Sequence, residues 1–212
     1  IFVWSKEKNP KDMFGITPHH SAAMKGHLKI CKFIIKHVEK KNPATKKGIT
    51  PLYVAACYGY LEICKLIIEI VDDKNPALNN GITPLYIAAY KGHLEICKLI
   101  IQSVHVKNPG NDNGETPLYA AACNGHLEIC KLIIDSVDDK NPATDTGATP
   151  LYGAAENGHL EICKLIIDCV NDKHPATNNG ATPFHVAARN GHFEICKLII
   201  ESVDKKNPAM ND

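Results

Sequence analysis

One motif recurs through almost the whole chain at a fixed interval of 33 residues. A Gly-x-Thr-Pro tetrapeptide begins at Gly15, Gly48, Gly81, Gly114, Gly147 and Gly180. A period of this length is typical of stacked supersecondary units, because one unit cannot bury its apolar face alone and does so against its neighbours. The 212 residues are therefore predicted to form one elongated domain rather than one or two globular ones.

Each 33-residue unit is predicted to contain a turn and two helices. In the unit that starts at Gly81, Asn80 and Gly81 form a turn dipeptide, because glycine takes a positive φ at no steric cost. Thr83 suits the N-cap of a first helix, and Pro84 suits its first position. Gly92 follows about two turns later and is predicted to end this helix in the left-handed conformation.

The second helix of this unit is predicted to start near Leu94 and to stop at Asn108, which precedes a proline and is therefore displaced from the α region. Its apolar residues follow spacings of three and four and widen to two faces: Leu94, Ile96, Cys97, Leu99, Ile100, Ile101 and Val104. We expect such a helix to be buried on both sides.

The sequence of the unit resembles that of the ankyrin repeat. Residues Thr83 to Ala89 read Thr-Pro-Leu-Tyr-Ile-Ala-Ala and are followed by Gly92-His93-Leu94, close to the family pattern Gly-x-Thr-Pro-Leu-His-x-Ala-Ala-x-x-Gly-His. All six units carry this motif. The resemblance implies an all-α ankyrin-repeat solenoid of helix-turn-helix units joined by hairpin-like loops. It also implies that the hairpin tips and first helices line a concave binding face.

The resemblance divides the chain into six repeats. They span residues 15–47, 48–80, 81–113, 114–146, 147–179 and 180–212, and residues 1–14 align with the end of a preceding second helix and its loop. The chain has no initiator Met and keeps an interior-like last helix, so we expect a segment of a longer array or a larger protein. A consensus design is the alternative; the nine Cys, the irregular first repeat and Tyr60 in place of the usual His favour a natural sequence.

Two departures from the family pattern affect the fold. The family's His after Thr-Pro-Leu survives only as His20 and His185, and the middle repeats carry Tyr53, Tyr86, Tyr119 and Tyr152 instead. The family's Gly after the second helix is replaced by Val38, Val71, Val104, Val137, Val170 and Val203. This second substitution predicts that each second helix runs one turn longer.

Charge is balanced overall, with 24 Lys and Arg against 23 Asp and Glu. The chain therefore has no large overall positive charge that would favour nucleic acid or a membrane surface as a partner. The distribution is uneven: residues 1–50 carry a net charge of +8 and the remainder −7. No signal peptide and no apolar run of bilayer length occur, so membrane contact is not expected.

The cysteines indicate a reducing compartment. Six of the nine occupy the same core position of the second helix: Cys31, Cys64, Cys97, Cys130, Cys163 and Cys196. Equivalent positions on stacked helices lie about 8–10 Å apart, too far for a disulfide. Cys57, Cys123 and Cys169 are additional. We therefore expect free thiols and a cytoplasmic protein.

Two histidine patterns have residue types that occur in catalytic or metal sites. His and Cys stand four residues apart in five repeats, as His27 and Cys31, His93 and Cys97, His126 and Cys130, His159 and Cys163, and His192 and Cys196. A zinc site needs about four converging ligands, so the favoured interpretation is that His opens the second helix and Cys packs as a small apolar group. His19 and His20 lack a carboxylate or Cys at ligand spacing. No catalytic, cofactor-binding or metal-ligating residue is predicted.

Positions that vary between repeats are the candidates for partner recognition, because the scaffold does not dictate them. The strip of apolar and aromatic candidates comprises Phe14, Met24, Ile49, Tyr58, Ile82 and Tyr90, edged by Lys25, Lys46, Lys47 and Lys91. The remaining candidates are Ile16, Glu115, Glu156 and Arg189. Tyr, Phe and Met are favoured in interface cores. The alternative for Phe14 and Met13 is that they only cover the edge of the array.

These observations predict a monomeric, non-catalytic scaffold that binds a protein or peptide, acidic or mixed in charge, on its concave face. One alternative is a targeting or regulatory array of a larger enzyme, such as a kinase or ubiquitin ligase, or of a membrane channel. Another is nucleic-acid binding through the basic first half, which would show a steep salt dependence.

Overall fold

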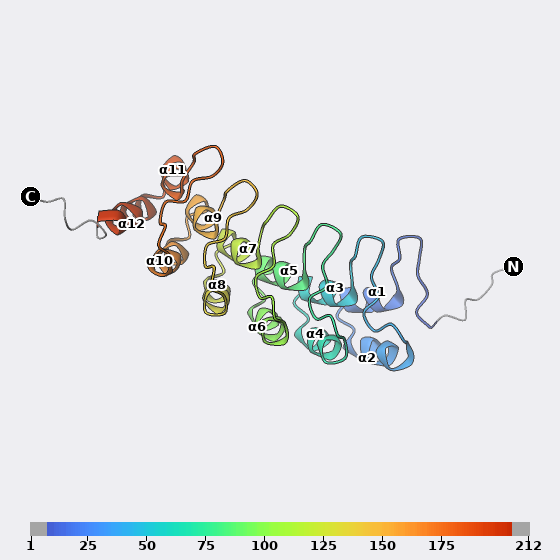
Figure 1. Cartoon of the computed structure of the whole chain (residues 1–212). Helices are drawn as coiled ribbons and strands as arrows, with labels where there is room; N and C mark the ends of the chain where they lie inside the picture. Colours follow the sequence, from blue (N-terminus) through green and yellow to red (C-terminus); the bar gives the residue numbers. More distant parts are fainter. Residues whose placement is uncertain (1–7, 205–212) are drawn as a thin grey trace, which may run out of the picture. The chain divides into compact units, whose positions relative to one another are not determined.

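The computed structural model describes residues 8–204. Within that range it contains twelve α-helices and no strand, and the helices come in pairs that follow the 33-residue period (Figure 1). The all-α, helix-turn-helix prediction is confirmed. Most of the predicted remnant of a preceding second helix falls in residues 1–7, outside the described residues.

Each repeat contributes a short first helix and a second helix. The first helices are α1 Pro18–Met24, α3 Pro51–Cys57, α5 Pro84–Lys91, α7 Pro117–Cys123, α9 Pro150–Glu156 and α11 Pro183–Arg189. The second helices are α2 Leu28–His37, α4 Leu61–Ile68, α6 Leu94–Ser103, α8 Leu127–Ile134, α10 Leu160–Cys169 and α12 Phe193–Asp204.

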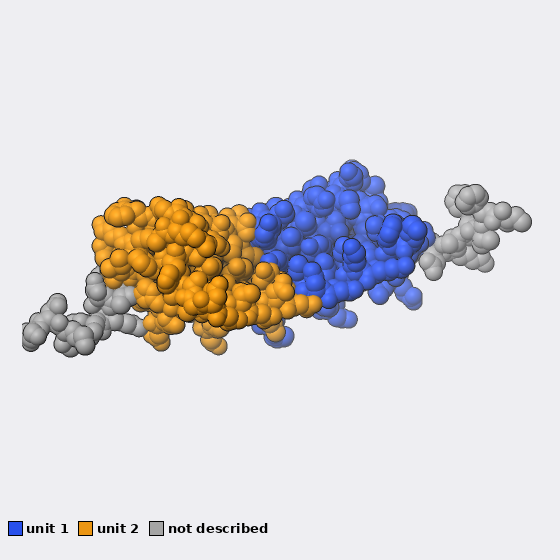
Figure 2. Space-filling model, turned by 90° about the horizontal axis from the view of Figure 1, so that it is seen from above, with its two compact units in different colours: residues 1–105 blue, residues 106–212 orange. Residues whose placement is uncertain are grey.

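The chain divides into two compact parts, here called the N-terminal half (residues 1–105) and the C-terminal half (residues 106–212), coloured blue and orange in Figure 2. The N-terminal half holds α1 to α6 and the C-terminal half α7 to α12. Within each half the hairpin tips, the first helices and the second helices form successive layers (Figure 1).

The first helices begin and end where the sequence predicts. Thr83 is the N-cap of α5, and its hydroxyl accepts a hydrogen bond from the backbone N–H of Tyr86 at 3.1 Å. Pro84 fills the first position, where a missing N–H costs nothing. Gly92 has a φ of 82° and caps the helix in the left-handed conformation. The short length of these helices therefore follows from local sequence.

A side-chain amide gives the first helices a second N-terminal partner. The Asn108 side-chain oxygen accepts a hydrogen bond at 2.9 Å from the backbone N–H of Leu118, ten residues later. The same bond links Asn42 to Leu52, Asn75 to Leu85 and Asn141 to Leu151. Each bond satisfies one of the backbone donors that a helix start leaves without a partner, and each ties the loop to the helix that follows it.

The second helices are apolar on two faces, as predicted. In α6, Ile96, Cys97, Ile100 and Ile101 are buried, and Leu99 is half-buried. The predicted extra turn is wrong for five of the six helices, because they end before the valine, and only α12 includes it. Val38, for example, is the extended C-cap of α2.

In α2 and α4 a lysine beyond the helix binds its last carbonyls. The Lys74 ammonium donates to the backbone carbonyls of Ile68 at 2.6 Å and Val71 at 3.0 Å. Lys41 does the same for Ile35 and Val38. Because the last carbonyls of the helix gain a cationic donor, no further helical turn is needed to satisfy them.

The hairpin tips form a row within each half. The tips are residues 12–16, 45–49 and 78–82 in the N-terminal half, and 111–115, 144–148 and 177–181 in the C-terminal half. Backbone hydrogen bonds join neighbouring tips, from Lys46 N–H to Phe14 O at 3.2 Å and from Asp145 N–H to Asn113 O at 3.0 Å. Side chains on one tip are therefore held next to those of the following tip.

Candidate protein-binding surface

The hairpin tips and first helices of the C-terminal half border the same open groove of about 470 Å³. Its lining includes Tyr119 and Tyr152 from α7 and α9, and Glu156 at the end of α9. Asp145 and Asn178 line it from the tips. Tips and first helices thus face a common space, which we call the C-terminal groove.

In the N-terminal half the predicted candidates occupy two rows. Phe14, Ile16, Lys46, Lys47, Ile49 and Ile82 lie on the tips, and Met24, Lys25, Tyr58, Tyr90 and Lys91 lie at the ends of the first helices. Phe14 and Tyr58 expose 62% and 54% of their surface, and Tyr90 exposes 42%. Large aromatic side chains are thus left open to a partner.

Three of the apolar candidates are less exposed than a residue that contacts a partner needs to be. Ile16, Ile49 and Ile82 are half-buried. The backbone carbonyl of Ile49 lies 3.0 Å from the His20 ring nitrogen Nε2, so this residue also joins the first two repeats. The structure therefore assigns these isoleucines a partly structural position.

The ends of the first helices carry the exposed aromatic residues. The helices α1, α3 and α5 pack side by side, so that Met24, Tyr58 and Tyr90 follow one another along the N-terminal half. Tyr58 stacks on Tyr60, with ring centroids 6.2 Å apart. The Lys91 ammonium lies 5.2 Å from the centre of the Tyr90 ring, within range of a cation–π attraction.

The tips and first helices of the two halves differ in charge. Among the described residues, this surface in the N-terminal half carries Lys25, Lys46, Lys47 and Lys91 against Asp12, counting the residue after each helix. The same surface of the C-terminal half carries Asp112, Glu115, Asp145 and Glu156 against Arg189. The uneven charge of the sequence therefore appears on equivalent surfaces of the two halves.

Of the three candidates of the C-terminal half, the structure brings Glu156 and Arg189 into contact. Glu156 accepts a hydrogen bond from Arg189 at 3.0 Å, across one repeat. Glu115 accepts one from the Asn111 side chain at 2.8 Å. Burial raises the pKa of the Tyr119 hydroxyl, and the Cys123 thiol and both carboxylates raise it further. Both glutamates therefore lie close enough to Tyr119 to raise the pKa of its hydroxyl.

The sequence did not identify the groove itself. In the sequence, Tyr119 and Tyr152 stand out only as departures from the family pattern, and Asp145 is not among the candidates. One signal was available in Gly153, a glycine within a first helix. A Cβ atom at this position would lie closer than 3.0 Å to the Cys123 sulfur, so glycine leaves room for the thiol beside Tyr119.

The His and Cys pairs occupy structural positions. His93 is the N-cap of α6, and its Nε2 lies 3.3 Å from the Cys57 carbonyl of the preceding repeat. Cys97 is completely buried, and burial raises its thiol pKa to about 12. The favoured interpretation of these pairs is confirmed. Residues 8–204 contain no group of three or more His, Cys, Asp or Glu placed to hold a metal ion.

The two adjacent histidines of the first repeat differ in their surroundings. His20 completes a capping box with Thr17 at the start of α1. His19 is buried, and neither of its ring nitrogens has a hydrogen-bond partner among the described residues. Burial and the neighbouring His20 lower the pKa of His19 to about 4. The side chain is thus a neutral group packed in the core.

Comparison with known proteins identifies the family. A family model described as ankyrin repeats in three copies matches residues 2–76, 70–144 and 134–211. The crystal structure of an ankyrin repeat domain from Acinetobacter baumannii AYE superposes with a TM-score of 0.78 at 26% sequence identity, covering 88% of this chain and 97% of that one. A search of curated protein sequences found no match. The chain belongs to the ankyrin repeat family.

Ankyrin repeats are in general protein–protein interaction modules, and the fold is typically non-catalytic. No helix within residues 8–204 combines the length and the apolar character needed to cross a bilayer.

Proposed function

We propose that this chain is a non-catalytic interaction module that binds a protein or peptide segment on the surface formed by its hairpin tips and first helices. The observation that carries the proposal is the exposure of Phe14, Tyr58 and Tyr90 on that surface of the N-terminal half. Aromatic side chains bury a large area at a small entropic cost and are enriched among the residues that dominate binding energy.

The lysines of the N-terminal half favour an acidic or mixed partner there. Lys25, Lys46, Lys47 and Lys91 are all exposed and flank the aromatic residues. A rim of one charge accelerates association with a segment of the opposite charge and selects against others. A standard interface of about 800 Å² per partner extends over several adjacent repeats.

We also propose that the chain acts as a monomer in a reducing compartment, the cytoplasm. All nine cysteines are free, and Cys64, Cys97, Cys130 and Cys163 are buried with a thiol pKa raised by burial to about 12. Folding thus needs no disulfide within the chain.

The proposal is tested by affinity capture from cell lysate, followed by mass spectrometry and calorimetry with the recovered protein. The bait is compared with Tyr58→Ala/Tyr90→Ala and with the control Phe33→Ala/Ile70→Ala, whose side chains are exposed on or just after second helices. We expect a partner whose affinity falls at least about tenfold with the first variant and less than about twofold with the control. A partner that ignores the tyrosines, or loses affinity equally with both variants, would contradict the proposed surface. Thermal unfolding confirms that all three proteins are folded.

A further inference from the structure

The C-terminal groove combines three features that suit a cationic side chain. It has a defined volume of about 470 Å³, it is lined by Tyr119 and Tyr152, and carboxylates of Glu156 and Asp145 lie at its wall. Aromatic rings offer apolar area together with a negative face, and carboxylates offer acceptors for charged donors.

We propose that this groove binds a lysine or arginine side chain of a basic peptide segment. The inference rests on the proposed function and adds to it the chemistry of a second contact region. The occupant is a protein segment because the groove lies on the tips and first helices, to which the proposed function assigns a protein partner. It is basic because the described part of this surface in the C-terminal half carries one cationic residue, Arg189, and four carboxylates, those of Asp112, Glu115, Asp145 and Glu156.

Arg189 does not close the site. It pairs with the Oε1 oxygen of Glu156 at 3.0 Å, and its own side chain is 64% exposed. An exposed ion pair of this kind is worth little, because solvent screens it. Arg189 also lies outside the groove lining. A cationic side chain can therefore reach Asp145 and Glu156 from the open side of the groove.

A small residue in α9 leaves room for a thiol beside one of the two groove tyrosines. Gly153 lies in the first helix that supplies Tyr152 and Glu156, and it lacks the Cβ atom that would meet the Cys123 sulfur. The thiol of Cys123 consequently packs between α7 and α9, next to Tyr119. The stem of a lysine or arginine is apolar and can pack on the rings of Tyr119 and Tyr152 while its charged end remains near the carboxylates.

The test uses a phage-displayed library of random dodecapeptides selected on the whole chain. Peptides that are retained are synthesised, and their dissociation constants are measured against the wild type and Asp145→Asn/Glu156→Gln. The control Asp135→Asn/Asp168→Asn removes the same charge from the exposed ends of second helices. Tyr58→Ala/Tyr90→Ala is included to assign peptides to the N-terminal half. Thermal unfolding of each variant shows whether its fold is intact.

We expect one group of peptides to be rich in Lys or Arg and to lose at least about tenfold in affinity with the groove variant, but less than about twofold with the control. Replacing their basic residues by leucine is expected to abolish binding, and added salt to weaken it. The inference is overturned if no peptide depends on the groove variant, or if those that do lack basic residues. In that case peptides sensitive to the tyrosine variant would still support the proposed function, whereas retention of no peptide at all would contradict both.

Discussion

His19 shows how one residue can make a repeat sensitive to acid. It stands where the family pattern has leucine, it is buried in the first repeat, and its ring nitrogens have no hydrogen-bond partner among the described residues. An unpaired polar group in a core costs free energy even when it is neutral. Protonation adds a buried charge, which is why the pKa falls to about 4.

The first prediction concerns the pH dependence of stability. The unfolded chain takes up a proton at His19 below about pH 6.5, but the folded chain does so only near pH 4. Stability is therefore unaffected by this group above about pH 6.5 and declines as pH falls from 6.5 to 4, by about 3 kcal/mol in total. Replacing His19 by leucine should remove this decline and stabilise the protein at pH 7 by about 1–2 kcal/mol.

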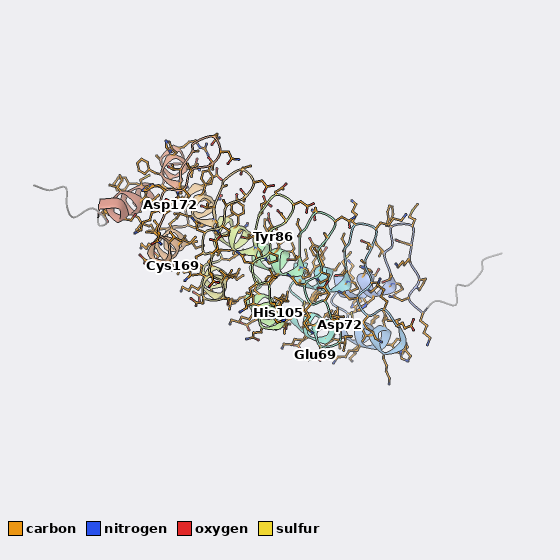
Figure 3. The ribbon with its side chains drawn as sticks, in the orientation of Figure 1. Glu69, Asp72, Tyr86, His105, Cys169 and Asp172 are labelled. Carbon is orange, nitrogen blue, oxygen red and sulfur yellow. The ribbon has the colours of Figure 1, made fainter. Side chains whose placement is uncertain are left out.

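Urea unfolding at pH 7.0 and 4.5, followed by circular dichroism, measures the difference between the wild type and His19→Leu. The exposed His105, labelled in Figure 3, provides the control His105→Leu, which should leave the pH dependence unchanged. If His19→Leu loses as much stability as the wild type between the two pH values, another group is responsible.

The second prediction concerns the packing of Gly153 against Cys123. Alanine is the better helix former by about 1 kcal/mol, but its Cβ atom would crowd the Cys123 sulfur. Gly153→Ala should therefore be more stabilising in a Cys123→Ala background than in the wild type, with a coupling of about 1–2 kcal/mol. A double-mutant cycle of unfolding free energies gives this coupling directly, and additive effects would show that the thiol simply turns away.

At the scale of the helix, each first helix is positioned by a cap inside the Thr-Pro motif and by an asparagine outside it. The threonine cap and the left-handed glycine were predictable from sequence, because both act through residues a few positions apart. The asparagine bond spans ten residues, from Asn108 to Leu118, whereas the local sequence at Asn108 predicts only a helix stop. Long-range partners of this kind have no short sequence signal.

The third prediction tests the asparagine bond. Asn108→Ala leaves the buried N–H of Leu118 without this partner, so we expect a loss of about 1–2 kcal/mol in unfolding free energy. Asn113→Ala, on an exposed hairpin tip, serves as the matched control and should change stability by less than about 0.5 kcal/mol. Thermal and urea unfolding provide both values; equal effects of the two substitutions would mean that the bond contributes nothing specific.

The candidate surface was predictable in part. The exposure of Tyr58 and Tyr90 followed from their position after the Ala-Ala pair, which the repeat pattern identifies. The half-burial of Ile49 and Ile82 did not follow, because it depends on how one tip packs against the next. The end of α4 is hard to predict for a similar reason, since the ammonium of Lys74 reaches back six residues to the carbonyl of Ile68.

At the scale of the whole molecule, one scaffold carries two surfaces of opposite charge. The N-terminal half presents lysines and aromatic residues on its tips and first helices, and the C-terminal half presents carboxylates around a groove lined by tyrosines. Each half buries the same repeated apolar core, and the residues that we propose to select a partner lie largely outside that core. By contrast, Glu69 and Asp72, which follow α4, lie on the side of the N-terminal half away from the tips (Figure 3).

The central claim, that the tips and first helices bind a protein, is tested most directly by amide hydrogen exchange of the chain with and without the partner recovered by capture. We expect slower exchange in the peptides that cover tips 45–49 and 78–82 and the ends of α3 and α5, and unchanged exchange in those that cover α4 and α6. Protection confined to the second helices, with none at the tips, would contradict the account.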